Sequence, residues 1–334
     1  MKKLLIFLFL AIIAVFVWYT LSLRPADSSS QERSAIKIES GMSVSQISDL
    51  LKQRGIIRSP LAFKLYTKFN GVESGLEAGK FVLRPSMNVS ELIEVLQDGK
   101  AEEMIITIPE GFTVKEIDEL LSDKGIIDGG EIIDCANACD FETYDFLPSG
   151  DGQIKRGGKL EGYLFPDTYY VNVEEFVSKF FLERMLNTFR RRVIETFPQE
   201  FESPERSLHQ IVTMASLIEE EAQNDEERSV ISGILWKRFD AGLGLGVDAT
   251  VRYVLNKQTE AITTADLNTN SDYNTRKFKG LPPGPIANAG EPSIKAALFP
   301  KESEYMYYLH GKDGQIRYAK TNEEHNLNRM DYLK

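Results

Sequence analysis

One stretch of the chain occurs twice, at an offset of 70 residues, and this repeat limits what the N-terminal half can fold into. Residues 38–57 and 108–127 share isoleucine, glycine, hydroxyl and leucine positions in the same order. Each copy opens with a short alternating stretch and a glycine turn, which is typical of a strand followed by a turn. Each then carries the pattern of a helix capping box and ends at a glycine, where a left-handed C-cap costs little. The repeat therefore predicts two strand–helix units.

The capping boxes are Ser43 with Gln46 and Thr113 with Glu116. In the first copy we also expect a helix near residues 61–69 and a closing strand near residues 80–83, which together give a βααβ unit. A third partial copy at residues 88–92 starts another helix.

This βααβ unit resembles the small LysM-type unit that binds N-acetylglucosamine polymers. The resemblance implies sugar binding, and plain scaffolding is the alternative. We place a LysM-like domain at residues 35–103 and a second LysM-like repeat at residues 104–150.

The N-terminus carries twenty residues without a charge, 4–23, which is long enough to span a bilayer as a helix. Lys2 and Lys3 precede the run, and Trp18 and Tyr19 lie near its far end, where aromatic side chains prefer the membrane interface. We therefore expect a single-pass anchor in the cytoplasmic membrane, with residues 1–3 as a cytoplasmic stub and the remaining domains extracytoplasmic. Residues 24–34 are polar and predict a flexible linker. A cleaved signal peptide is the alternative, although the apolar run is long for one.

Composition excludes several classes of function. The formal net charge is −11 and no Lys/Arg-rich block stands out, which argues against nucleic acid as a partner. The sequence has no HExxH, no paired CxxC and no GxSxG, so we expect no metal and no Ser-His-Asp site. The glycines of residues 242–246 miss the GxGxxG spacing, and we expect no cofactor. Cys135 and Cys139 are close enough on a helix for a disulfide in an oxidising compartment, and buried thiols are the alternative.

Residues 211–222, IVTMASLIEEEA, carry the strongest candidate for chemistry. On a helix, Glu220 points away from the apolar face into solvent, and Glu219 and Glu221 flank that face. A sheltered carboxyl has a raised pKa, which a general acid needs at neutral pH. A solvated acidic run is the ordinary alternative. The apolar face itself is formed by Ile211, Met214, Ala215, Ile218 and Ala222.

The remaining C-terminal pattern predicts a helix-rich body. We expect helices over residues 176–197 and 225–239, a proline-rich loop at 280–286, and a strand pair at 303–309 and 315–319. Thr321 caps a last short helix. The fold class is therefore α+β.

Six motifs occur in a characteristic order: residues 161–168 (EGYLFPDT), 215–221 (ASLIEEE), Asp248 with Thr250, 273–275 (YNT), 281–286 (LPPGPI) and 325–326 (HN). In this order they resemble the endolytic murein transglycosylases of the YceG-like family over nearly the whole chain. The resemblance implies a transmembrane helix, a LysM-like βααβ unit and a mixed α/β catalytic domain with a helix-rich core at residues 104–334.

The resemblance also implies roles for individual residues. The catalytic acid of the family falls on Glu219 as general acid and base, with Glu221 in support. Asp248, Tyr273, Asn274 and Asn288 are expected substrate contacts, and structural turn roles are the alternative for the last three.

The chain departs from the family pattern at a few positions. Leu245–Gly246–Val247 precedes Asp248 where a glutamine and a small hydroxyl residue are usual. Ala249 and Ala289 stand where prolines are common, and Arg276 where an aromatic residue is common. These departures affect the expected sugar contacts and leave the acid in place.

The implied reaction cleaves the β-1,4 bond between N-acetylmuramic acid (MurNAc) and N-acetylglucosamine (GlcNAc) within nascent peptidoglycan strands, gives 1,6-anhydro-MurNAc ends and ends strand elongation. The implied partners are peptidoglycan strands, the membrane and penicillin-binding protein synthases. Two alternatives stay open. One is a non-catalytic peptidoglycan-binding scaffold for cell-wall synthases, and the other is a hydrolase that uses water with Glu221 or Asp248 as second carboxylate.

Overall fold

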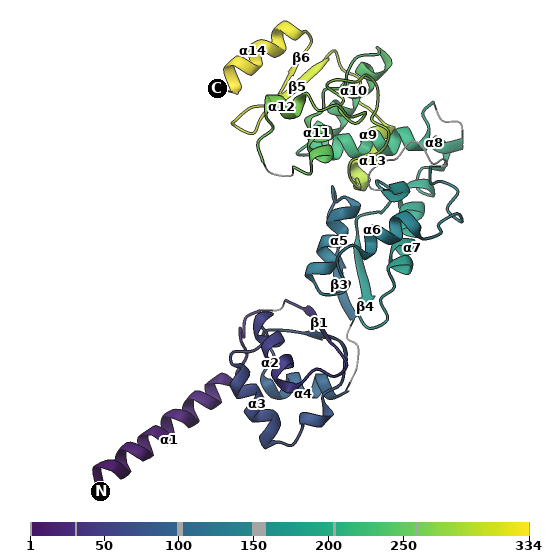
Figure 1. The fold of residues 1–334 in the computed structure, drawn as a ribbon. Helices are drawn as coiled ribbons and strands as arrows, with labels where there is room; N and C mark the ends of the chain where they lie inside the picture. The colour runs from purple at the N-terminus through teal and green to yellow at the C-terminus, as the bar shows by residue number, and fades with distance from the viewer. Residues whose placement is uncertain are drawn as a thin grey trace. The chain divides into compact units, whose positions relative to one another are not determined.

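The computed structural model describes residues 2–30, 32–98, 103–148, 158–202, 205–257 and 260–333 and forms two compact units (Figure 1). The first unit contains Met1–Ile106, Leu120–Gly129 and Tyr169–Phe176, and the second contains Thr107–Glu119, Gly130–Thr168 and Val177–Lys334. The units are thus built from interleaved segments. The domain boundaries expected from the sequence stay predictions, and the one at residue 150 lies outside the described residues.

The first unit contains the βααβ order that the repeat predicts. Its strands pair antiparallel, from Ser34 opposite Leu83 to Ile38 opposite Gly79. Isoleucine, leucine and phenylalanine side chains of these elements form one buried core. Sugar binding by this unit stays a prediction. Up to residue 98, the elements of the unit are α1 (Lys2–Ser22), β1 (Ser34–Ile38), α2 (Val44–Gln53), α3 (Pro60–Phe69), η1 (Glu73–Gly75), β2 (Gly79–Leu83) and α4 (Val89–Asp98).

Both predicted capping boxes are formed. The backbone N–H of Ser43 donates to Gln46 Oε1 at 2.8 Å, and that of Thr113 donates to Glu116 Oε2 at 2.8 Å. The glycine that follows each helix has φ of +70° or +73°, the left-handed conformation that a C-cap requires. Local hydrogen bonding therefore sets both ends of these two helices, as predicted.

The second copy of the repeat has the same order of elements: β3 (Glu103–Thr107), α5 (Val114–Asp123), α6 (Glu131–Ala138) and β4 (Thr168–Asn172). β3 pairs with β4 in a two-stranded sheet. The connection from α6 to β4 includes η2 (Gly158–Leu160) and most of the EGYLFPDT motif. Cys135 in α6 and Cys139 directly after it form a disulfide, so they are not the buried thiols that the sequence left as the alternative.

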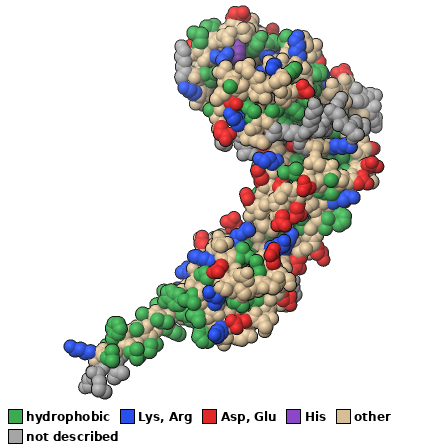
Figure 2. Space-filling model, in the orientation of Figure 1, with side chains coloured by type: hydrophobic (Ala, Val, Ile, Leu, Met, Phe, Trp, Pro, Cys, Tyr) green, Lys and Arg blue, Asp and Glu red, His purple; other side chains and the backbone are tan. Residues whose placement is uncertain are grey.

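The N-terminal helix α1 presents exposed apolar side chains along its length (Figure 2). Across the part of the chain that the structure describes, no helix combines the length and the apolarity that a membrane crossing needs. The span predicted for residues 4–23 is therefore not confirmed.

The second unit is built mainly of helices around α9 (Leu208–Glu221). This helix packs against α10 (Asp225–Asp240), α11 (Asp248–Leu255) and α13 (Glu291–Leu298). Residues 211–218 of α9 are all buried, so the prediction of a single apolar face was too narrow. Neighbours on several sides cover polar positions too. The Ser216 hydroxyl, for example, accepts the N–H of Ile286 from the proline-rich loop at 3.0 Å.

The other elements of this unit are α7 (Ser178–Phe189), the π-helical turn η3 (Arg190–Ile194), α8 (Pro198–Glu202), α10 (Asp225–Asp240), α11 (Asp248–Leu255), α12 (Thr264–Leu267), α13 (Glu291–Leu298), β5 (Tyr307–His310), β6 (Ile316–Ala319) and α14 (Asn322–Tyr332). β5 and β6 pair antiparallel, which confirms the predicted strand pair. The Thr321 hydroxyl accepts the N–H of Glu324 at 3.2 Å and caps α14 as expected.

The proline-rich loop packs on Gly162, which has φ of +85°. A Cβ at this position would overlap the ring of Pro285 and lie 3.0 Å from Val212 Cγ1. We therefore expect Gly162→Ala to lower the free energy of unfolding by about 2 kcal/mol or more, measured by urea denaturation. Gly280→Ala is the matched control, because Gly280 has φ of +87° and nothing within 4 Å. Equal losses in the two variants would contradict the packing argument.

Candidate active site

Three consecutive glutamates end α9, and each faces a different part of the second unit. Successive residues on a helix are rotated by about 100°, so the three side chains diverge. Glu219 faces the start of α13 and the side of α10. Glu220 faces a cavity, and Glu221 faces Tyr308 of β5.

The carboxyl group of Glu219 is held by two donors. Its Oε2 accepts the N–H of Gly290, the N-cap residue of α13, at 2.9 Å. Its Oε1 lies 3.4 Å from Nη2 of Arg228 on α10. The Glu219 side chain is 7% exposed. A cation and an N–H at a helix start both stabilise a carboxylate, so this group is fixed in place and nearly removed from water.

Arg228 is itself fixed by neighbours. Its Nε donates to Ser293 Oγ of α13 at 3.0 Å, and its Nη1 pairs with Asp225 at 2.6 Å. The guanidinium therefore bridges α10 and α13 beside Glu219. This leaves little freedom for the Glu219 carboxyl to change its orientation.

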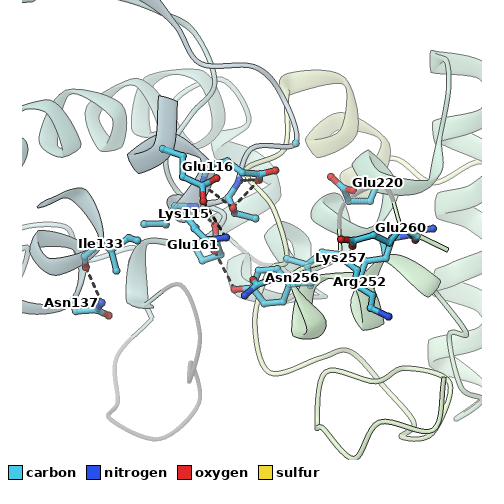
Figure 3. Close-up of a pocket in the computed structure, with 17 residues that line it drawn as sticks. Lys115, Glu116, Ile133, Asn137, Glu161, Glu220, Arg252, Asn256, Lys257 and Glu260 are labelled. Atoms are coloured by element: carbon cyan, nitrogen blue, oxygen red, sulfur yellow. Dashed lines mark hydrogen bonds and ion pairs between the residues drawn. The ribbon is translucent and has the colours of Figure 1, made fainter. Parts of the chain in front are cut away.

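Glu220 lines a cavity of about 650 Å³ (Figure 3). In this view Glu116 and Glu161 lie to the left of Glu220, Arg252 and Glu260. The cavity is open to water, yet the surrounding protein raises the pKa of Glu220 to about 7, mainly by desolvation. The charges of Glu116 and Glu219 raise this pKa further, and Arg252 opposes them. Glu220 is therefore a second carboxyl with a pKa suited to proton transfer.

Glu161 is the buried carboxyl of the cavity wall and is 1% exposed. Its Oε1 accepts the N–H of Val114 at 3.0 Å, and its Oε2 accepts the hydroxyl of Tyr253 at 3.1 Å. Nδ2 of Asn288 lies 3.4 Å from Oε1. Glu161 thus joins the start of α5, α11 and the loop before α13.

Glu221 lies among other titratable groups. Burial raises its pKa to about 7, and the charges of Asp248 and Glu220 add to this, while a hydrogen bond from Tyr308 and the charge of Arg276 lower it. Asp248 forms an ion pair with Arg276. The structure therefore brings Glu221, Asp248 and Arg276 together, and it pairs the unexpected arginine with the predicted aspartate.

Comparison with known proteins decides the family. The model of the YceG-like family matches residues 36–331. The chain belongs to the YceG-like family. The crystal structure of a YceG-like protein from Listeria monocytogenes superposes with a TM-score of 0.66 at 31% identity, covering 89% of this chain and 99% of that one. This likeness confirms the predicted mixed α/β fold.

Two curated relatives are named endolytic murein transglycosylase. The one from Bacillus subtilis (strain 168) is 33% identical over 321 residues, which cover 93% of this chain and 88% of the relative. The one from Streptococcus pneumoniae (strain ATCC BAA-255 / R6) is 26% identical over 342 residues, which cover 93% of this chain and 60% of the relative.

Three of the predicted substrate contacts of this YceG-like protein are buried. Asn288 is 0% exposed, Asn274 is 1% exposed and Tyr273 is 4% exposed. Nδ2 of Asn274 donates to the carbonyls of Leu267 and Thr269 at 3.0 and 2.9 Å. The ring of Tyr273 packs at a tilt of 39° against that of Tyr253, with ring centroids 5.3 Å apart. Neither these three residues nor Asp248 is found among the described residues that line the cavity. The Asp248 side chain is 45% exposed and pairs with Arg276.

Sequence reasoning missed Glu161 and Glu220 as site residues, and it missed Glu110, which lies beside Glu219. A signal for Glu161 was present, because it opens the EGYLFPDT motif. A signal for Glu110 was present too, because the two copies of the repeat differ at this position. The first copy has Ser40 where the second has Glu110.

The raised pKa of Glu221 predicts a pH-dependent contribution to stability. The folded protein keeps the Glu221 proton up to about pH 7, whereas an unfolded chain releases it near its ordinary pKa of about 4.3. The stabilisation is therefore complete below the unfolded value and is lost as the pH rises through about 7. As the pH rises from 5 to 8, we expect the free energy of unfolding of Glu221→Gln to increase relative to that of the native chain, measured by urea denaturation. Glu302→Gln, on an exposed loop, is the control, and parallel curves for Glu221→Gln and the native chain would contradict the assignment.

Proposed function

We propose that this YceG-like protein cuts the β-1,4 bond between MurNAc and GlcNAc inside nascent glycan strands and leaves 1,6-anhydro-MurNAc ends. That the chain is a peptidoglycan lytic transglycosylase rests on its relatives named endolytic murein transglycosylase. The position of the cut, the anhydro product and an effect on strand length are our proposal. The observation that supports it is the nearly buried, doubly held carboxyl of Glu219 at the end of a buried helix.

The proposed reaction uses one carboxyl group twice. Protonated Glu219 gives its proton to the glycosidic oxygen while the bond from that oxygen to C1 of MurNAc breaks, and the bonding electrons leave with the oxygen. The resulting carboxylate then takes the proton of the MurNAc C6 hydroxyl. The C6 oxygen bonds to C1 and closes the 1,6-anhydro ring. Glu219 ends protonated, and no water is consumed.

A fixed geometry makes a carboxyl group a more effective general acid, which favours Glu219 over its two neighbours. The Gly290 N–H and Arg228 come from two different helices and hold Glu219 in one orientation. Glu220 is the competitor, since it lines the cavity and has a pKa of about 7. Glu221 is hydrogen-bonded to Tyr308 and keeps the supporting role proposed for it.

The cavity beside Glu220 is the place where we propose that the glycan binds. Its volume of about 650 Å³ lies in the range of small-ligand sites, and the ring of Tyr253 in its wall offers a surface for a sugar. Asp248 is the predicted contact whose side chain is available to substrate. We propose that Tyr273, Asn274 and Asn288 act indirectly, by holding the loops around the site.

Product analysis tests the proposal. The full chain is incubated with purified peptidoglycan, and the products are separated by length and read by mass spectrometry. We expect internal cuts whose new ends are lighter by one water than hydrolysed ends. Reducing ends would point to a hydrolase with a second carboxylate. Binding without products would favour the alternative of a scaffold for cell-wall synthases. We propose penicillin-binding protein synthases as partners, both for a transglycosylase and for a scaffold.

A further inference from the structure

Glu110 and Glu219 lie against the same glycine, although they are distant in sequence. The N–H of Gly290 donates to Glu219. A Cβ built on Gly290 would overlap the carboxyl group of Glu110. The φ of Gly290 is −74°, a conformation open to any residue, so what a side chain here would meet is the exposed carboxyl group of Glu110 and not backbone strain.

We propose that Glu110 and Glu219 form an electrostatically coupled pair of carboxyl groups, in which Glu110 is a positioning residue that sets the pH range of the reaction. The inference rests on the proposed function, because it assigns the acid of that reaction to Glu219. Two neighbouring carboxylates repel each other, so the charge of one disfavours ionisation of the other.

The hydrogen bonds of Glu219 show why a second carboxyl is useful. N–H donors and a guanidinium favour the charged form of a carboxyl, which opposes a role as proton donor. A neighbouring carboxyl opposes that preference through like-charge repulsion. Glu110 is placed to repel the Glu219 carboxylate, because its carboxyl group lies against Gly290, whose N–H binds Glu219.

The electrostatics of Glu110 agree with this geometry. The pKa of Glu110 is raised by desolvation first and by the charge of Glu219 second, Asp225 adds to the rise, and Arg228 opposes it. Two further charged groups belong to the packed elements. Glu220 at the end of α9 interacts with Glu219, and Glu291, which follows Gly290 in the chain, pairs with Arg192 from η3.

The first test is a titration that does not depend on activity. The carboxyl carbons of Glu110 and Glu219 are followed by NMR across pH in the native full chain and in Glu219→Gln. We expect the pKa of Glu110 to fall by about 1 unit when the neighbouring charge is removed. Glu302→Gln, at an exposed loop position of the same unit, should leave the pKa of Glu110 unchanged. An unchanged pKa of Glu110 in Glu219→Gln would overturn the pair.

The second test is the pH profile of kcat/KM on peptidoglycan. In Glu110→Gln we expect the alkaline limb to move to lower pH by about 1 unit, because the neighbouring negative charge of Glu110 is then removed. Glu110→Asp keeps the charge, so its alkaline limb should lie between those of Glu110→Gln and the native chain. A uniform loss of activity with an unmoved limb would mean that Glu110 only supports the structure.

The two tests separate failure of the inference from failure of the proposed function. If the native chain makes no anhydro ends, the function fails, while the NMR titration still decides whether the pair exists. If anhydro ends form and neither the titration nor the limb moves, only the inference fails. If Glu110→Gln does not fold, Glu110→Asp and the titration in Glu219→Gln still decide it.

Discussion

Glu219→Gln is expected to lower turnover of peptidoglycan by about 10²–10⁴-fold, the range that general acid–base catalysis contributes. Glutamine has the shape of glutamate and can still accept the N–H of Gly290, but it has no carboxyl proton to deliver. The fold should therefore stay intact, with a lower thermal unfolding midpoint because the ion pair with Arg228 is lost. Anhydro ends counted by mass spectrometry, together with a thermal melt, measure both effects.

Glu220→Gln and Glu221→Gln are the matched controls, since they make the same chemical change at adjacent positions of α9. We expect each to keep at least a tenth of the native turnover. A loss confined to Glu220→Gln would move the acid to the carboxyl that lines the cavity. Native-like turnover in Glu219→Gln would remove Glu219 from the role.

Asn288→Ala is expected to lower the free energy of unfolding by about 3 kcal/mol or more. Asn288 Oδ1 accepts the N–H of Leu164 at 2.9 Å, and its Nδ2 donates to the carbonyl of Phe112 at 2.8 Å. Alanine would leave these buried groups without the amide, and each unsatisfied group costs about 1–3 kcal/mol. Urea denaturation measures the loss.

Asn326→Ala on α14 is the control, because Asn326 is exposed and such changes stay within about 0.5 kcal/mol. The same measurement separates the two roles considered for Asn288. A direct sugar contact would raise KM at unchanged stability, whereas a support role lowers stability first. Native-like stability in Asn288→Ala would contradict the support role.

Arg276 shows how a departure from the family pattern is accommodated. The sequence alone put the sugar contacts near this position in doubt. In the structure Arg276 pairs with Asp248, and its charge also lowers the pKa of Glu221. The arginine therefore belongs to the surroundings of the α9 terminus, and Asp248 keeps a half-exposed side chain beside it.

Local features of this protein could be predicted from its sequence. The capping boxes at Ser43 and Thr113, the βααβ order of the first repeat and the β5–β6 pair are all as expected. Each depends on residues a few positions apart, and short-range hydrogen bonding and alternation decide such features with little help from the rest of the chain. The family motifs likewise led us to propose the acid at the end of α9.

Only the tertiary structure decided what surrounds that acid. Periodicity predicted one apolar face on α9, but neighbouring helices and the proline-rich loop bury residues 211–218 on all sides. It could not reveal that Glu110 from the second repeat meets Glu219 at Gly290, because these positions are far apart in sequence. The family resemblance left open whether Asn288 contacts sugar or has a structural role. The fold buries its amide against Phe112 and Leu164. Burial and charge pairing depend on which segments meet, and packing of the whole second unit determines that.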